Sequence, residues 1–124
     1  MSKIYNLAFA LLFSTSVVWA SDGNQPQPEK SSLKEAILSD PESIAEGEKK
    51  FNSLCAYCHG SKGSGGKAKK LQSREFEPDY LFRTITNGIK RGSLNMPPWN
   101  KLSEETRWKL VAYILSLGKN TGDN

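Results

Sequence analysis

The sequence predicts a small all-α fold in one domain, and three observations support this prediction. Four stretches carry apolar residues at helical spacing, and residues that commonly cap helices stand at their ends. No stretch alternates apolar and polar residues as a half-buried strand does, and no segment repeats. The chain has 124 residues, of which 37% are hydrophobic, and this is enough apolar material for one core.

Residues 1–20 have the three parts of an export signal. Lys3 supplies a positive start, residues 7–13 are apolar, and Ala20 ends a stretch of the kind that signal peptidase cleaves. We therefore expect a signal peptide over residues 1–20, cleavage after Ala20 and a periplasmic mature chain without a membrane span. The alternative is an uncleaved anchor that faces the periplasm, because residues 4–20 approach the roughly 17-residue minimum for crossing a bilayer.

Residues 21–39 are predicted to be an extended leader that contains a short helix. Residues 22–30 are polar and include two prolines, a composition typical of extended chain. Ser32 and Glu35 have the spacing of a capping box. This spacing predicts a helix over residues 33–39.

Residues 40–120 are predicted to form the folded domain, which opens with a helix. Asp40 can cap that helix with its side chain, and Pro41 occupies a position in the first turn where no donor is needed. The residues that follow at helical spacing define its apolar face: Ile44, Gly47, Phe51 and Leu54. We expect this helix to run into the pair of cysteines that follows it.

Residues 60–70 contain four glycines and four lysines, which predicts a flexible, solvated loop. A phosphate-binding loop is excluded by two features of the spacing. Gly60 and Gly66 are one residue too far apart, and Ala68 follows Lys67 where that motif needs serine or threonine.

Two further helices are predicted towards the C-terminus. Pro78 begins the first, and Asn87 with Gly88 ends it. The second begins at residues 103–105 and ends at Gly118. Its apolar residues form two adjoining stripes: Trp108, Val111 and Leu115 on one, and Leu110, Ile114 and Leu117 on the other.

Cys55, Cys58 and His59 form the motif that indicates which cofactor the chain binds. Two thiols at this spacing can form thioethers to both vinyl groups of one porphyrin, and the adjacent histidine can ligate its iron. A redox dithiol would need a βαβ setting, and a zinc site would need a fourth ligand. The chain has two cysteines and one histidine, so the motif predicts a single covalent haem c.

Met96 is the predicted second axial ligand of the haem iron. It is the one methionine left when Met1 is removed with the signal peptide, and His59 is the only histidine. Met96 lies between Asn95 and two prolines, which predicts a rigid loop rather than a helix. Pairing of histidine with methionine is usual in electron-transfer haems, while an open position or another donor remains the alternative.

These residues resemble class I c-type cytochromes over nearly all of residues 40–118. Gly47 and Phe51 precede the cysteines where that family has a glycine and an aromatic residue. Leu110 and Tyr113 occupy the places of an apolar residue and an aromatic in its last helix. The resemblance implies a small helical domain wrapped around one haem, in which these two helices cross and the four residues close one side of the haem pocket.

The distribution of charge predicts a basic face near the haem edge. Residues 22–48 hold seven acids and two bases, whereas residues 49–101 hold eleven bases and three acids. The bases considered for this face are Lys62, Lys67, Lys69, Lys70, Lys90 and Arg91, and the alternative is that they form an ordinary solvated face. Such a face favours acidic redox partner proteins. Nucleic acid is disfavoured because no helix-turn-helix or zinc-finger pattern accompanies the bases.

Three functions are compatible with these residues. The first is a periplasmic electron carrier between a donor dehydrogenase or quinol-oxidising complex and an acceptor, with no catalytic residues of its own. The second is a fixed haem subunit of a larger oxidoreductase complex. The third is a haem sensor or peroxidase, which is disfavoured because the chain lacks a second histidine for acid-base chemistry.

Overall fold

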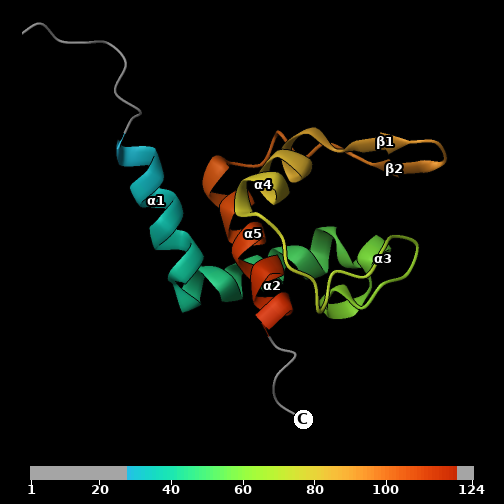
Figure 1. Ribbon diagram of the computed structural model, residues 1–124, viewed down its shortest axis with the longest axis horizontal. Coiled ribbons are helices and arrows are strands. Elements are labelled where there is room, and N and C mark those ends of the chain that lie inside the picture. The colour runs from blue at the N-terminus through green and yellow to red at the C-terminus, as the bar shows by residue number, and fades with distance from the viewer. Residues whose placement is uncertain (1–27, 120–124) are drawn as a thin grey trace, which may run out of the picture.

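The structure, a computed structural model, describes residues 28–119 (Figure 1). Its elements follow in the order α1 (Pro28–Ser39), α2 (Pro41–Leu54), α3 (Ala56–His59), the 3-10 helix η1 (Ser61–Gly63), α4 (Pro78–Asn87), β1 (Ile89–Arg91), β2 (Leu94–Met96) and α5 (Glu104–Lys119). The helices confirm the all-α prediction, to which the described region adds one short antiparallel hairpin, β1–β2. The predicted signal peptide lies outside the described residues.

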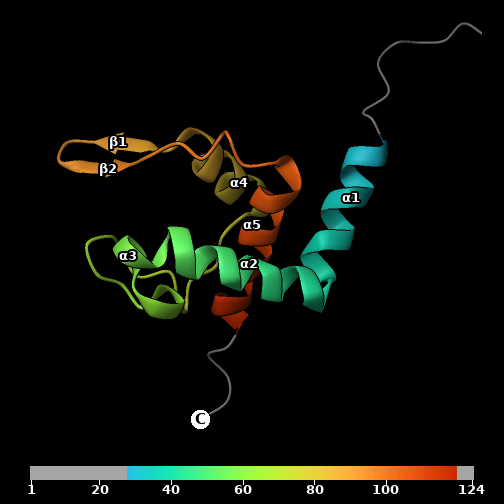
Figure 2. The same cartoon turned by 180° about the vertical axis from the view of Figure 1, so that it is seen from behind.

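Helices α2 and α5 cross at the centre of the molecule (Figures 1 and 2). Gly47 lies where they meet, since a Cβ added there would lie 2.0 Å from the Lys109 carbonyl oxygen. Phe51 is fully buried beside Tyr113, with the two ring centroids 5.2 Å apart. Leu110 is part of the same core. The helix crossing that the resemblance implied is therefore confirmed.

α1 lies far from the two cysteines. α1 packs against α5, and the two views place it at the opposite end of the molecule from α3 and the β1–β2 hairpin (Figures 1 and 2). Lys34 Nζ lies 2.9 Å from Asp79 Oδ2 and so joins α1 to α4. α4 packs on α5 through its buried residues Leu81 and Ile85.

The helix starts expected at Asp40 and Pro78 are confirmed. Asp40 caps α2, because its Oδ2 accepts hydrogen bonds from the Ser43 amide at 2.8 Å and from the Ser43 hydroxyl at 2.7 Å. These bonds hold the pKa of Asp40 below its usual value. α4 ends at Asn87, and Gly88 follows it with a φ of +70°, which glycine adopts without strain.

The leader departs from its prediction, because α1 begins at Pro28. Residues 28–32 are helical rather than extended, and Ser32 lies inside α1 instead of capping it. Packing supplies the reason: Ile37 is buried and Leu38 packs against the core. A docked helix extends more readily than a free one, so it can include residues whose own preference for helix is weak.

Gly118 was expected to end the last helix, yet α5 continues to Lys119. A Cβ on Gly118 would lie 2.5 Å from the Arg74 carbonyl oxygen. The glycine therefore allows the chain near Arg74 to approach the helix. Among residues 28–119, no helix combines the length and hydropathy needed to cross a membrane.

Candidate haem-binding site

α2 leads directly into the two cysteines, as expected. The Cys55 amide donates to the Phe51 carbonyl at 2.8 Å, so Cys55 ends α2 and precedes α3. The Cys58 amide then donates to the Cys55 carbonyl at 3.1 Å. Residues three apart in a helical turn share one face, which places both thiols on the same side of the turn. Both cysteines are half-buried and free of disulfides, and burial raises the pKa of Cys55 to about 11.

The imidazole of His59 is oriented by the main chain. Its Nδ1 lies 3.2 Å from the Lys69 carbonyl oxygen. A carbonyl oxygen can only accept, so this contact places the proton on Nδ1 and leaves the lone pair on Nε2. A metal-ligating histidine usually has its second nitrogen held in this way. His59 is therefore set to present Nε2 as a ligand.

The loop that supplies the Lys69 carbonyl is folded back onto the motif. The Ala68 amide donates to the Cys58 carbonyl at 2.8 Å, and the Gly65 amide donates to the His59 carbonyl at 2.7 Å. The loop was expected to be flexible, and these bonds correct that expectation. Its lysine side chains are nevertheless exposed, as a solvated loop requires.

Met96 is held by three backbone features. It is the last residue of β2, where it pairs with Ile89, so the expected loop is wrong for Met96 itself, although residues 97–99 are irregular and no part of the segment is helical. A Cβ on Gly88 would lie 2.3 Å from the Met96 carbonyl oxygen, so only glycine permits this approach. Just beyond, the Trp99 amide donates to the Ile85 carbonyl at 2.9 Å. The segment around Met96 is thus fixed to the end of α4.

The predicted residues lie in two arms on one side of the α2–α5 crossing. One arm contains α3 with Cys55, Cys58 and His59, and the other is the β1–β2 hairpin that ends at Met96 (Figures 1 and 2). Several partly buried apolar side chains pack against the core, among them Leu71, Phe76, Trp99 and Leu102. Two thiols on one face, an oriented imidazole and a thioether are a donor set that fits a covalent haem.

Comparison with known proteins assigns the family. Residues 42–114 match the family model described as cytochrome c oxidase, cbb3-type, subunit III. The chain belongs to this family of c-type cytochromes. The cytochrome is also similar in fold to the crystal structure of cytochrome CL from the marine methylotrophic bacterium Methylophaga aminisulfidivorans, with a TM-score of 0.56 and 24% identity over 79% of this chain and 70% of the other. A search of curated proteins found no match.

The family and the fold together establish the coarse function of the cytochrome. It is a haem c electron-transfer protein, and its single attachment motif corresponds to one covalent haem c. The resemblance to class I c-type cytochromes is confirmed by the family match and by the fold. The matched range includes both cysteines, His59 and Met96.

Two supporting groups were not identified from the sequence. The carbonyl of Lys69, which orients His59, belongs to the backbone, and a backbone carbonyl leaves no mark in a residue pattern. The sequence predicted Gly88 only as the residue that ends a helix. Its close contact with the Met96 carbonyl depends on how the hairpin returns towards α4, which the spacing does not reveal.

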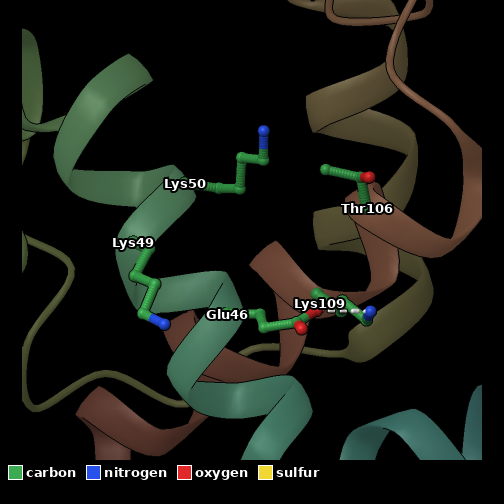
Figure 3. A pocket seen from close by; sticks show the side chains of 5 residues that line it. All are labelled: Glu46, Lys49, Lys50, Thr106 and Lys109. Atoms are coloured by element: carbon green, nitrogen blue, oxygen red, sulfur yellow. Dashed lines mark hydrogen bonds and ion pairs between the residues drawn. The ribbon is translucent and has the colours of Figure 1, made fainter.

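A groove of about 320 Å³ lies between α2 and α5, outside the candidate haem site (Figure 3). Its lining residues are Glu46, Lys49, Lys50, Thr106 and Lys109. Lys109 Nζ lies 2.5 Å from Glu46 and 2.6 Å from Glu105, and its hydrogen bond holds the pKa of Glu46 below the usual value. The pair with Glu46 joins α5 to α2, and the pair with Glu105 lies within α5, so the residues that line the groove have a structural role.

Proposed function

We propose that this cytochrome is a diffusible electron carrier of the periplasm. In this proposal haem is attached to Cys55 and Cys58, and His59 and Met96 ligate its iron. The supporting observation is that the main chain holds both ligand-bearing segments, through the Lys69 carbonyl on one side and the strand pairing of Met96 on the other. Ligands positioned before the cofactor binds keep a fixed geometry in both oxidation states.

The proposed ligands explain why such a chain would transfer electrons without further chemistry. Haem iron supplies a one-electron exchange between its ferric and ferrous states. The thioether of Met96 favours the ferrous state and so raises the reduction potential. If His59 and Met96 both ligate the iron, dioxygen and peroxide would find no open coordination position there.

The near-infrared spectrum of the ferric protein tests the ligand assignment. Sulfur bound to ferric iron gives a weak charge-transfer band, which we expect in the natural protein and not in Met96→Ala. Leu94→Ala, an exposed change on the same hairpin, is the matched control and retains the band. A natural protein without the band, or a Met96→Ala variant that keeps it, would remove the basis for the proposal.

The partners in this proposal are acidic proteins that approach the basic face. The loop bases of this face, Lys62, Lys67, Lys69 and Lys70, are all exposed, as are Lys90 and Arg91 on the hairpin. α1 and the start of α2 lie towards the other end of the molecule (Figure 1), and residues 28–48 there hold six acids and two bases. A charge asymmetry of this kind orients the molecule during diffusional encounter.

Periplasmic location rests on the export signal proposed for residues 1–20. The mass of the mature protein tests it, because cleavage after Ala20 leaves a chain that starts at Ser21. A mass that includes residues 1–20, found in the membrane fraction, would favour the anchored alternative instead.

A fixed haem subunit is the second candidate, and the family description favours it, because that description names an oxidase subunit. Size-exclusion chromatography of native extract separates the two candidates. Elution at the size of the chain alone supports the diffusible carrier. Elution with a large haem-containing complex at every ionic strength supports the subunit.

A further inference from the structure

Tyr57 is the most exposed of the large apolar side chains in the described region, at 79% of its full exposure. It stands between Cys55 and Cys58, so it lies within two residues of both proposed attachment points. Tyrosine is enriched at protein interfaces because its ring is apolar while its hydroxyl can hydrogen-bond. Neither the fold nor the proposed iron ligands explain its position.

Lys67 holds the Tyr57 ring in place. The Lys67 ammonium donates a hydrogen bond to the Tyr57 hydroxyl, and it lies 3.8 Å from the centroid of the ring. Lys67 comes from the same loop whose Ala68 amide is bonded to the Cys58 carbonyl. A side chain that is already ordered loses less conformational entropy when a partner covers it.

The chain around Lys67 is basic. Residues 60–74 contain five bases and no acid. Lys62, Lys69 and Lys70 in this segment are exposed near the pair along the chain. An exposed aromatic residue that contacts one base and lies in a basic part of the chain matches a partner surface that has carboxylates beside an apolar spot.

We propose that Tyr57, held by Lys67, is the contact residue through which this cytochrome docks its redox partner, an acidic protein with an apolar spot at its own electron-transfer site. This inference rests on the proposed carrier function. Tyrosine is among the residues that contribute most to binding when they lie at the centre of an interface. The surrounding lysines set the rate of encounter, while Tyr57 sets how long the complex lasts.

The test measures oxidation of the reduced holoprotein by membranes of its source organism, with the apparent KM and kcat obtained separately. Tyr57→Ala is expected to raise the apparent KM about tenfold. Lys67→Gln is expected to raise it about threefold at low salt and less at high salt. Oxidation by ferricyanide, the midpoint potential and the reduced spectrum stay unchanged for Tyr57→Ala, which shows that its haem environment is intact.

Tyr80→Ala and Lys49→Gln are the matched controls. Tyr80 is also exposed, but it adjoins Asp79, which pairs with Lys34 of α1 at the far end of the molecule. Lys49 lines the groove between α2 and α5 (Figure 3). Both controls are expected to keep the natural KM.

Three results would overturn the proposal. If Tyr57→Ala keeps the natural KM while the natural protein is oxidised efficiently, the carrier function stands and Tyr57 is not the contact. If membranes neither oxidise nor reduce the natural protein, although ferricyanide does oxidise it, the carrier function fails together with the contact. If Tyr57→Ala loses only its binding to phosphatidylglycerol vesicles, with KM unchanged, the pair contacts lipid.

Discussion

At the residue scale, the chemistry depends on small groups that fix the orientation of larger ones. His59 presents Nε2 because its Nδ1–H donates a hydrogen bond to the Lys69 carbonyl. That carbonyl is in place because Ala68, one residue earlier in the chain, donates its amide hydrogen to the Cys58 carbonyl. The motif of two cysteines and a histidine could be read from the sequence, whereas this backbone support could not.

Ala68→Pro tests the backbone support of His59. Proline has no amide hydrogen, so the bond to Cys58 is lost and the Lys69 carbonyl loses its anchor. We expect a lower Tm and a shifted midpoint potential in the holoprotein, measured by thermal melting and redox titration. Ala68→Gly keeps the donor and should retain the natural potential. Equal potentials for all three proteins would show that the loop does not position His59.

Asp40 provides a test of the pH dependence of stability. Hydrogen bonds from Ser43 lower the pKa of the folded carboxyl, so its stabilising effect is present above the unfolded pKa near 3.8 and is lost as the pH falls through the folded value. Asp40→Ala should lower Tm by a few degrees at pH 7 and by less at pH 3. Asp40→Asn keeps a neutral cap, so its Tm should stay near the natural value at pH 7. A Tm deficit of Asp40→Ala that is the same at both pH values would contradict the role of this carboxylate.

At the scale of the elements, the sequence predicted the helix ends that depend on local capping residues better than those that depend on distant contacts. Asp40 and Pro78 begin helices where the sequence places them, because a cap acts on its own neighbours. The start of α1 and the end of α5 depend on contacts with distant segments, such as the approach of Arg74 to Gly118. The hairpin was missed because three-residue strands are too short to show an alternating pattern.

Gly47→Ala tests the crossing of α2 and α5. The added methyl group would lie 2.0 Å from the Lys109 carbonyl oxygen, so the helices must move apart. We expect a loss of about 2 kcal/mol or more in the free energy of unfolding, measured by denaturant titration of the holoprotein. Lys50→Ala, an exposed change on the same helix, should cost little. Similar losses in both variants would mean that close approach at Gly47 does not hold the helices together.

At the scale of the whole molecule, the chain separates its charges along its length. Residues 28–48 contain six acids and two bases, and residues 49–74 contain bases alone. The two segments extend towards opposite ends of the molecule (Figures 1 and 2). Composition predicts this asymmetry, but its relation to the haem site follows only from the fold, which places α1 and α3 far apart.

The charge asymmetry predicts opposite salt effects on two small oxidants. Oxidation of the reduced protein by anionic ferricyanide should slow as ionic strength rises, and oxidation by cationic tris(phenanthroline)cobalt(III) should quicken, because salt screens attraction and repulsion alike. Lys62→Gln with Lys70→Gln should weaken both trends more than Lys49→Gln with Lys50→Gln. Stopped-flow rates at several salt concentrations provide the measurement. If both double variants weaken the salt dependence equally, electrons leave the protein at a site other than the basic face.

The proposed ligation by His59 and Met96 is tested most directly by adding carbon monoxide to the reduced holoprotein at neutral pH. Carbon monoxide needs an open axial position on ferrous iron, so the natural protein should keep its spectrum and Met96→Ala should change to that of the carbon monoxide complex. Rapid formation of that complex by the natural protein would contradict the account, since iron that binds ligands freely belongs to a sensor or a peroxidase.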